Sequence, residues 1–438
     1  MTIELRPYQR ELVDEVAGAF ASGARSVVMQ LGTGGGKTAT ASAILARAVA
    51  KGRRAIFIAH LDSLLEDTAE RLTRAGLHTG YVQAGRPSDA SAPIQVCSMQ
   101  TLHSRGTRPP ADFAIVDEAH RVMGASIRGI LDAYPKAWLL GLTATPQRGD
   151  AKPLGDVFDR LICGPSNREL TDAGFLVPVD VLAPASFSGK ALVDDPVSAY
   201  AKHAAGTRAL VFAANVAHAE ELTAGFNAAG YPARCVTGET SRDDRRAVRD
   251  AVTAGDVLVL VGVGVFIEGF DLPALETIVL ARPFSVTGSF LQSIGRGLRP
   301  CLSTGKLRCT VIDLRGSVHA HGLPDEERVW SLTGKAVRRA ETITALRRCA
   351  ECLAIFRPAK NCPRCGVTSV AAAKIPRVLT RAEKLVNWSD VPAAKRDERY
   401  LRRLEALATM RMHMPPDRAR AWALSRFTKQ FKRRPEAA

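Results

Sequence analysis

The chain has 438 residues and a formal net charge of +16, with 60 Lys and Arg residues against 44 Asp and Glu residues. That length suits two or three domains with sizeable cores. The longest apolar run, Val257 to Ile267, is too short and too glycine-broken for a membrane span, and the N-terminus lacks the basic-then-apolar order of a secretion signal, so we expect a cytoplasmic protein.

Apolar and helix-forming segments alternate through residues 1–165. Strands are expected at Ser26–Met29, Ala55–Ala59, Ile94–Cys97, Phe113–Val116 and Trp138–Gly141. Such alternation predicts a parallel sheet with helices on both faces. We therefore expect these residues to form a first α/β domain.

The first expected strand leads into a glycine-rich turn followed by an alanine-rich, helix-forming stretch. The turn consists of Leu31, Gly32, Thr33, Gly34, Gly35, Gly36, Lys37 and Thr38. Glycines let backbone N–H groups close around phosphate oxygens, and the helix N-terminus adds partial positive charge. Lys37 would reach the β- and γ-phosphates of ATP, and the Thr38 hydroxyl would ligate Mg²⁺. An ordinary glycine-rich turn is the alternative, and Leu31 stands where the strict pattern has Gly.

An acidic pair follows the strand expected at Phe113–Val116, in the sequence Asp117-Glu118-Ala119-His120. The carboxyl ends of parallel strands are where ligands collect in such sheets. Asp117 would hold Mg²⁺, usually through water, and Glu118 would polarise the water that attacks the γ-phosphate. The alternative is an Asp-capped helix start. The next strand leads into residues 142–146, whose Thr hydroxyls could hydrogen-bond the acidic pair.

A second alternating block covers residues 206–330, after a proline-rich connector with short elements at residues 166–205. Its strands are expected at Ala209–Phe212, Arg234–Val236, Val257–Val261, Thr277–Leu280 and Cys309–Ile312. The chain thus contains two similar α/β halves.

Late in the second block lies Gln292-Ser-Ile-Gly-Arg296-Gly-Leu-Arg299. Two arginines three residues apart share one helical face. In a cleft between the domains, Arg296 and Arg299 could reach phosphates and stabilise transition-state charge. Contact with nucleic acid or solvent is the alternative. Upstream, residues 268–273 form a loop that we expect to face the same cleft.

The nine cysteines fall into two groups. Five are scattered, mostly in apolar strand-like runs, and are expected as small buried hydrophobes: Cys97, Cys163, Cys235, Cys301 and Cys309. The others form two Cys-x2-Cys pairs within residues 345–370: Cys349, Cys352, Cys362 and Cys365. Paired knuckles place four thiolates around one tetrahedral Zn²⁺, and disulfides are disfavoured in the cytoplasm. Four thiolates leave no open position, so we expect this zinc to be structural.

Charge is concentrated at the C-terminal end. Residues 1–330 hold 35 basic and 35 acidic residues, whereas residues 331–438 hold 25 basic and 9 acidic ones. A neutral body with a basic tail, expected to be helical over residues 374–438, suggests a polyanion partner, most simply nucleic acid. A solvated tail that maintains solubility is the alternative.

Taken together and in this order, the motifs resemble the superfamily-two helicases with a DEAH box. The matching segments run from Leu5-Arg6-Pro7-Tyr8-Gln9 to Arg299, roughly two-thirds of the chain, and are specific as a set. The adjoining zinc knuckles and basic tail look most like the RadD-type bacterial DNA-repair helicases and their phage-encoded relatives. The resemblance implies two tandem RecA-like domains with ATP bound between them.

The resemblance also implies roles for single residues. Gln9 would read adenine with support from Arg6, and His120 and Gln292 would couple the acidic pair to the arginines. The loop at residues 268–271 would contribute Gly269 and Asp271 to the nucleotide site. Four segments resemble those that grip the nucleic-acid backbone: residues 58–64, 98–101, 211–215 and 237–238. Many members carry Ser or Thr before the 268–271 loop, where this chain has Gly262-Val-Gly264, which weakens the expectation of a backbone contact there.

We therefore expect an ATP-driven helicase or translocase that acts on DNA in repair, recombination or phage replication, without a membrane partner. Four alternatives stay open: a double-strand translocase that does not separate strands, an RNA helicase, a nucleic-acid-binding protein with a regulatory ATPase, and the motor subunit of a restriction enzyme. The last is weakened because we find no nuclease-like segment. No motif indicates a particular protein partner.

Overall fold

The computed structural model describes residues 3–368, apart from residues 61, 122–124, 148–151, 185–191, 193, 265–271, 334–336, 339–345, 350 and 360, and isolated positions between 415 and 428. The chain divides into two compact units, residues 1–377 and 378–438. The elements named below all belong to the first unit. The basic helical tail expected at residues 374–438 lies outside the described residues, except for a few single helical positions.

The first half of this unit is built on a parallel seven-stranded sheet in the order β3-β4-β2-β5-β6-β1-β7. Its strands are β1 (Ser26–Gln30), β2 (Ala55–Ala59), β3 (Thr79–Val82), β4 (Ile94–Ser98), β5 (Phe113–Val116), β6 (Trp138–Thr143) and β7 (Arg160–Cys163). The five predicted strands are confirmed. The two that the sequence did not predict, β3 and β7, lie at the two edges of the sheet, where polar residues interrupt the apolar pattern.

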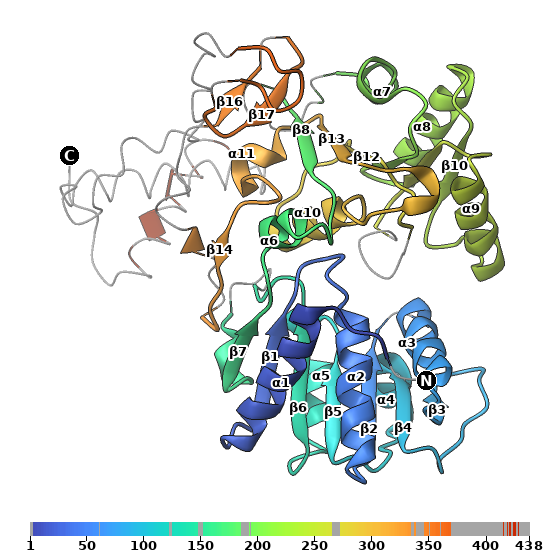
Figure 1. Cartoon of the computed structure of the whole chain (residues 1–438), viewed down its shortest axis with the longest axis vertical. Helices are drawn as coiled ribbons and strands as arrows, with labels where there is room; N and C mark the ends of the chain where they lie inside the picture. The colour runs from blue at the N-terminus through green and yellow to red at the C-terminus, as the bar shows by residue number, and fades with distance from the viewer. Residues whose placement is uncertain are drawn as a thin grey trace. The chain divides into compact units, whose positions relative to one another are not determined.

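Helices cover both faces of this sheet. On one face lie α1 (Pro7–Ala21), α2 (Lys37–Ala50) and α3 (Asp62–Arg74), and on the other lie α4 (Met99–Arg105) and α5 (Ala125–Leu131) (Figure 1). Short 3-10 turns occur at η1 (Ala119–Arg121) and η2 (Leu154–Asp156). In α1, Pro7 occupies the first turn, where its missing N–H costs nothing, and Leu12, Val13, Val16 and Ala19 face the core at helical spacing.

The second half is built on an eight-stranded sheet in the order β10-β11-β9-β12-β13-β8-β17-β16. Its strands are β8 (Val179–Leu182), β9 (Ala209–Phe212), β10 (Ala233–Val236), β11 (Val259–Gly262), β12 (Thr277–Leu280), β13 (Cys309–Asp313), β16 (Arg347–Arg348) and β17 (Ala354–Phe356). The strands β8 to β13 are parallel, and β17 and β16 extend the sheet antiparallel. The segment expected as a connector, residues 166–205, therefore supplies a sheet strand, β8, as well as the link.

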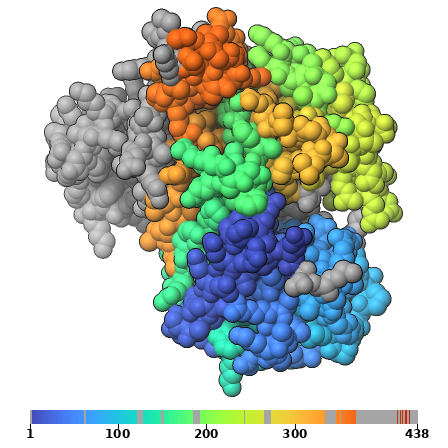
Figure 2. All heavy atoms as spheres, viewed as in Figure 1, coloured from blue at the N-terminus to red at the C-terminus, as the bar shows by residue number. Residues whose placement is uncertain are grey.

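The helices of the second half are α6 (Asn167–Asp172), α7 (Pro196–Ala204), α8 (Val216–Ala228), α9 (Arg242–Ala254), α10 (Thr287–Gly295) and α11 (Ser317–His321), with a 3-10 turn at η3 (Leu302–Thr304). The side chains of Asn215 and Ser241 cap α8 and α9 by accepting hydrogen bonds from the first-turn N–H groups. The space-filling view shows α8 and α9, coloured yellow-green, at the surface of this half (Figure 2).

After α11 the chain returns to the first half. We call residues 324–332 the strap. The side-chain amide of Asn167 donates to the carbonyl of Pro324 at 3.1 Å, and the N–H of Gly155 donates to the carbonyl of Leu332 at 3.0 Å. The strap contains β14 (Arg328–Val329), which pairs with β15 (Val337–Arg338). The bond from Asn167 holds the start of the strap to α6 of the second half, and the bond from Gly155 fastens its end to the first half.

The scattered cysteines are less uniformly buried than expected. Cys97 and Cys309 are buried, but Cys163 is exposed and Cys235 and Cys301 are half-buried. An apolar neighbourhood in sequence does not imply burial at the end of an edge strand, which is where Cys163 lies. Within the described part of the chain, we find no helix with the length and apolar character needed to span a bilayer.

Candidate active site

The glycine-rich turn joins β1 to α2, and contacts with α1 fix its shape. The carbonyl of Gly35 accepts hydrogen bonds from the hydroxyl of Tyr8 at 2.8 Å and the amide of Gln9 at 3.0 Å. Gly36, the N-cap of α2, has a left-handed φ of 88°, and a Cβ there would overlap the Gln9 amide. Only glycine satisfies both constraints. Because α2 begins at Lys37, the helix N-terminus opens toward the turn.

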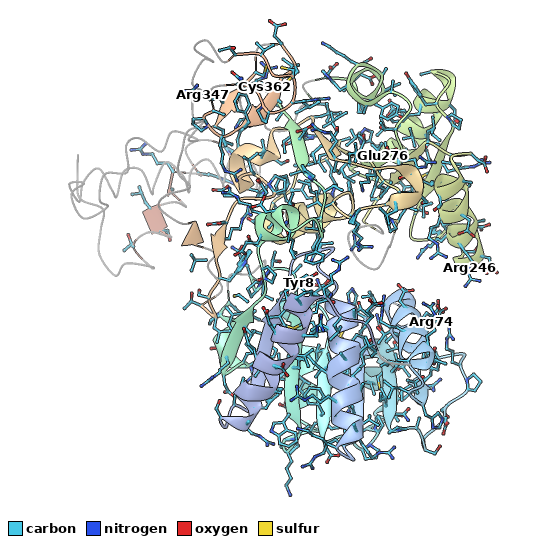
Figure 3. The ribbon with its side chains drawn as sticks, viewed as in Figure 1. Tyr8, Arg74, Arg246, Glu276, Arg347 and Cys362 are labelled. Carbon is cyan, nitrogen blue, oxygen red and sulfur yellow. The ribbon has the colours of Figure 1, made fainter. Side chains whose placement is uncertain are left out.

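The residues expected to read adenine, Arg6 and Gln9, make hydrogen bonds within the protein. The Gln9 amide spans from the carbonyl of Gly35 to the N–H of Arg6, which donates to it at 3.0 Å. Arg6 donates to the Tyr8 hydroxyl at 3.1 Å and lies 4.8 Å from the ring centroid of Phe175. Tyr8, labelled at the start of α1 in Figure 3, packs edge-on against Phe175 at 5.2 Å.

Sequence reasoning gave no role to Tyr8 or Phe175. Tyr8 lies inside the motif that carries Arg6 and Gln9, so its position could have been noticed. Phe175 follows α6, about 140 residues from the glycine-rich turn, and no local pattern links the two.

The acidic pair turns sharply out of β5. The N–H of Asp117 donates to the carbonyl of Ile58 at 2.9 Å, which continues the sheet, and the N–H of Glu118 donates to Asp117 Oδ1 at 2.9 Å. Glu118 has a φ of 50°, a conformation that residues with a Cβ rarely adopt outside functional sites. This turn brings Glu118 Oε1 to 3.8 Å from Lys37 Nζ.

Side chains from both halves contact Glu118. His120 Nδ1 lies 3.3 Å from Glu118 Oε2, and the amide of Gln292, on α10 of the second half, donates to the same oxygen at 3.3 Å. His120 Nδ1 also lies 3.2 Å from Thr143 Oγ1. The hydroxyl expected to bond the acidic pair therefore reaches it through His120. The Thr143 hydroxyl itself donates to the carbonyl of Thr145 at 2.9 Å.

The two carboxyls of the pair have opposite pKa shifts. Burial and the charge of Glu118 raise the pKa of Asp117 to about 6. Burial also disfavours the charged form of Glu118, but Lys37, His120 and Arg296 outweigh it and hold the pKa of Glu118 below its ordinary value. Glu118 is thus ionised at neutral pH and able to accept a hydrogen bond from water, while Asp117 carries a buried charge that a cation would stabilise.

The oxygen donors at this edge of the sheet fit Mg²⁺. Thr38 offers a hydroxyl in the first turn of α2, and Asp117 offers a carboxylate at the end of β5. Hard oxygen ligands are those that Mg²⁺ prefers, and its charge would offset the desolvation that raises the pKa of Asp117.

The arginine segment of the second half packs on the glycine-rich turn. A Cβ on Gly295 would overlap the Thr33 side chain, and Arg299 Cγ lies 3.4 Å from where a Cβ on Gly34 would sit. Arg296 is buried, and its charge acts on Glu118. Burial lowers the pKa of Arg299 to about 10, which leaves it cationic at neutral pH. The structure therefore brings Lys37, Glu118, Gln292 and both arginines into one region.

Other predicted site residues are placed less completely. Gly269 and Asp271 lie outside the described residues. Of the segments expected to grip nucleic acid, the turn at residues 237–238 is held by Arg245, which donates to the carbonyls of Thr237 and Gly238 at 3.2 and 3.0 Å. Gln100 ties two other segments by donating to the carbonyl of His60 at 3.0 Å.

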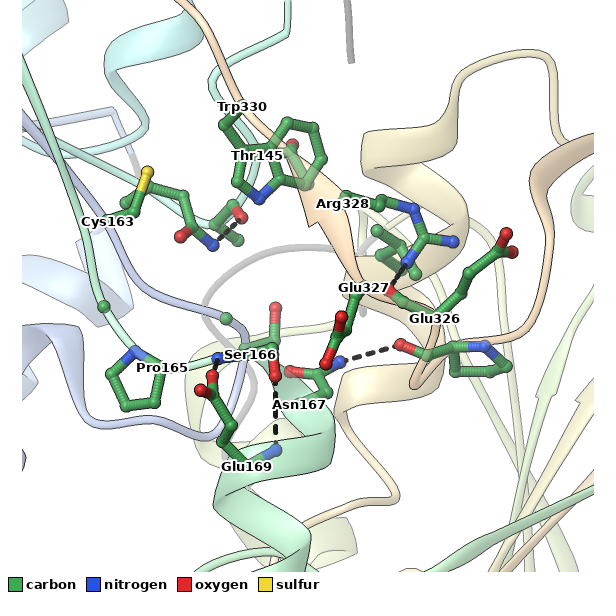
Figure 4. Close-up of a pocket in the computed structure, with 17 residues that line it drawn as sticks. Thr145, Cys163, Pro165, Ser166, Asn167, Glu169, Glu326, Glu327, Arg328 and Trp330 are labelled. Atoms are coloured by element: carbon green, nitrogen blue, oxygen red, sulfur yellow. Dashed lines mark hydrogen bonds between the residues drawn. The ribbon is translucent and has the colours of Figure 1, made fainter. Parts of the chain in front are cut away.

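A separate cavity of about 200 Å³ lies beside the glycine-rich turn (Figure 4). Its lining includes Thr33 and Thr145 of the first half and Glu326 and Trp330 of the strap, and Trp330 lies beside Thr145 in Figure 4. The cavity thus borders the start of the glycine-rich turn, at Gly32 and Thr33, whereas Lys37 and Asp117 do not line it.

The four clustered cysteines have the geometry of a zinc site. Their sulfur atoms lie within 4.8 Å of one another, with Cys349 and Cys365 at 3.6 Å and Cys352 and Cys362 at 3.6 Å. A tetrahedral Zn²⁺ with Zn–S bonds of about 2.3 Å requires sulfur separations of about 3.8 Å. The four thiols therefore fit one ion. The cluster also packs into the second half, because β17 lies between its two knuckles and pairs with β8.

Comparison with known proteins agrees with this arrangement. Residues 2–148 match the family described as type III restriction enzyme, res subunit, and residues 192–301 match the helicase conserved C-terminal domain. The chain is an ATP-hydrolysing enzyme of the superfamily-two helicase class. A 51.5 kDa protein of a Lactococcus phage is 26% identical over 77% of this chain and 77% of its own length.

A Saccharomyces cerevisiae protein named as an ATP-dependent helicase, IRC3, is 28% identical over 72% of this chain. The chain spans about half (52%) of that yeast relative. Among solved structures, a fragment of an HsdR subunit of a type I restriction enzyme from Vibrio vulnificus has a TM-score of 0.58 at 23% identity, covering 76% of this chain and 70% of its own. S. cerevisiae Dbp5 bound to RNA and ADP BeF3 has a TM-score of 0.51 at 16% identity, covering 71% and 88%. These two structures share the tandem RecA-like fold of this helicase-class enzyme.

Proposed function

We propose that this enzyme couples ATP hydrolysis between its two halves to movement along DNA, or to DNA unwinding. The observation that carries the proposal is the hydrogen bond from Gln292 to Glu118. It joins the second half to the carboxylate that would orient the attacking water. A change of nucleotide state at that carboxylate would therefore affect the contacts of both halves. Closing and opening of the two halves would couple the ATPase cycle to movement on DNA.

Each residue of the site has a proposed role. Lys37 binds the β- and γ-phosphates, and Glu118 orients water for attack on the γ-phosphate. Arg296 and Arg299 stabilise the charge that develops on the transferred phosphoryl group. Thr38 and Asp117 would hold Mg²⁺, which supplies charge neutralisation on the phosphates when it is bound.

The ion pair between Lys37 and Glu118 gives ATP binding a direct consequence. Their 3.8 Å separation supports an exchange of partners, because a γ-phosphate would attract the Lys37 ammonium away from Glu118. Glu118 would keep its contacts with His120 and Gln292, and its other oxygen would become available to a water molecule. Binding of ATP thus makes Glu118 available to orient water.

DNA is the proposed polymer. The excess of basic residues in 331–438 supports a polyanion partner. A restriction-modification enzyme with this fold, LlaBIII, has a structure bound to DNA, whereas Dbp5 is bound to RNA, so the fold alone does not select the polymer. We base the choice of DNA on the resemblance of the zinc cluster and basic tail to RadD-type DEAH-box helicases. The same resemblance leads us to propose a role in repair, recombination or phage replication, in the cytoplasm.

The deciding experiment measures ATP turnover without nucleic acid and then with single-stranded DNA, duplex DNA, forked DNA and RNA. We expect strong stimulation by at least one form of DNA and near-abolition of turnover by Lys37→Ala or Glu118→Gln. Lys51→Ala is the matched control, because Lys51 is an exposed lysine at the other end of α2. If none of the polymers raises turnover, the proposal is wrong. Stimulation by RNA alone would reassign the substrate.

Translocation on duplex DNA without strand separation is the alternative within the same class. Release of a labelled strand from a forked duplex identifies unwinding. Displacement of a third strand from a triplex, with no forked-duplex product, identifies translocation.

A further inference from the structure

In the hairpin that follows Arg299, a lysine is buried and two leucines are exposed, the reverse of the usual distribution. Cys301 and Lys306 pair as an antiparallel bridge, and the N–H of Lys306 donates to the carbonyl of Cys301 at 3.2 Å. The Lys306 side chain is buried, with 6% of its surface exposed, whereas Leu302 and Leu307 are 98% and 82% exposed. Lysines are rarely fully buried without a partner. The reversal indicates that Lys306 has a specific partner inside the second half.

That partner is a backbone carbonyl. Lys306 Nζ donates to the carbonyl of Pro273 at 3.1 Å. Four titratable groups face the ammonium: Cys309 from β13, Cys301 from the hairpin, Glu276 from the turn before β12, and Arg299. Burial raises the pKa of Cys309 to about 12, so that thiol stays neutral. Glu276, labelled in Figure 3, is the carboxylate of the group and also lies 3.7 Å from Arg208.

The bond to Pro273 joins the hairpin to the segment that leads into β12. Pro273 follows the 268–271 loop, and Cys301 comes two residues after Arg299. The segment from Arg296 to Arg299 lies tightly on the sheet, since a Cβ on Gly297 would sit 2.5 Å from Cys309 Sγ. A segment packed this closely on one side can shift mainly at its ends. Lys306 holds the hairpin at the end that follows Arg299.

We propose that Lys306 is a positioning residue, whose ammonium holds the hairpin to Pro273 and so keeps Arg299 against the glycine-rich turn. The inference rests on the proposed role of Arg299 in ATP hydrolysis. Burial lowers the pKa of Lys306 to about 8, so the ammonium loses its proton at moderately alkaline pH. A neutral amine makes a weaker hydrogen bond than an ammonium, so the contact between Lys306 and Pro273 weakens as pH rises through the pKa of Lys306.

The test measures kcat and KM for ATP without nucleic acid across about pH 6.5 to 9, a range that brackets the pKa of Lys306 and stays below the pKa of Arg299, which is about 10. The proteins are wild type, Lys306→Arg, Lys306→Met and the control Lys202→Arg, which changes an exposed lysine of α7. We expect wild-type and control kcat to fall as pH rises through about 8, and Lys306→Arg to lack this fall. Lys306→Met should have a kcat about tenfold below wild type at neutral pH, with KM changed less than about threefold, because misplacing a catalytic group affects the transition state most.

Two results would overturn the proposal: a wild-type kcat in Lys306→Met, or an alkaline fall that is the same in wild type and Lys306→Arg. Thermal unfolding of each variant shows whether it folds, and if Lys306→Met does not, the pH profiles of the other two proteins decide. Arg299→Ala separates this inference from the proposed function. If Arg299→Ala abolishes turnover and folded Lys306→Met does not, only the role of Lys306 is rejected. If Arg299→Ala leaves turnover intact, the proposed role of Arg299 and the proposed role of Lys306 are both rejected.

Discussion

At the scale of single residues, Asp117 links the chemistry of the site to the stability of the protein. Its pKa is raised from 3.8 to about 6 by burial and by Glu118. A carboxyl whose pKa is higher in the folded state stabilises the fold fully below its unfolded pKa, and that contribution is lost as pH rises through the folded pKa. The empty enzyme is therefore expected to lose stability between about pH 4 and pH 6.

Replacing Asp117 with Asn tests this expectation. The Asn side chain keeps an oxygen that can accept from the N–H of Glu118 but carries no charge. Without nucleotide or Mg²⁺ at about pH 8, the unfolding free energy of Asp117→Asn should exceed that of wild type by of the order of 1 kcal/mol, and its melting temperature should be higher. Near pH 4 the two proteins should be equally stable. Turnover should be lost at both pH values. Equal melting temperatures at the higher pH would contradict the assigned shift.

The candidate site was predictable from sequence where its contacts are local. Lys37 and Thr38 open α2, and Asp117 and Glu118 directly follow β5, so short patterns reveal them. Contacts between distant segments left no such pattern: Phe175 meets Arg6, and Lys306 meets Pro273, only in the folded chain. The sequence also gave no sign that Glu118 adopts a left-handed backbone.

At the scale of elements, the close approach of α10 to the glycine-rich turn depends on Gly295. A Cβ there would overlap Thr33 across the two halves. Alanine favours a helix over glycine by about 1 kcal/mol, so Gly295→Ala should not destabilise α10 itself. We expect ATP turnover to fall about tenfold or more, because the arginine segment is displaced, while the melting temperature is not lowered.

A glycine with free space provides the control for this variant. Gly18 lies in α1, and a Cβ there meets no atom within 4 Å. Gly18→Ala should keep wild-type turnover. Normal activity in Gly295→Ala would mean that the two elements separate during the cycle without a need for close packing.

Strand prediction succeeded for the central strands and for β10 at one edge of the second sheet, and it missed β3, β7 and β8. Central strands such as β2 and β9 are buried throughout and read as continuous apolar runs. The strand β8 was expected as part of a connector because prolines flank it, and in the structure Val179 and Asp180 are only partly buried. Its place in the second sheet is set by pairing with β13 and β17, which the sequence does not reveal.

At the scale of the whole molecule, the cysteine cluster should stabilise the second half. Its two knuckles flank β17, a strand of the second sheet. We expect about one zinc ion per chain by metal analysis, and chelation should lower the melting temperature because binding energy of structural zinc is folding energy. Cys362→Ser should lose the ion, whereas Cys235→Ser, outside the cluster, should keep it. Full zinc retention by Cys362→Ser would remove the assignment.

The basic tail should contribute affinity for DNA through charge. Deleting residues 374–438 is expected to weaken DNA binding and to flatten its dependence on salt, because fewer counterions are released. A chain with a Gly-Ser segment of equal length in place of the tail controls for bulk. The measurement is fluorescence anisotropy with labelled DNA over a series of salt concentrations. Unchanged affinity and slope would leave the tail as a solvated extension.

The strap has a mechanical consequence for the whole enzyme. The polypeptide leaves the first half after β7, and its return through Leu332 provides a second attachment at Gly155. A body held at two anchor points can swing about the line that joins them, but it resists twisting or sliding apart. In the proposed cycle, these two connections would restrict how the halves move relative to each other.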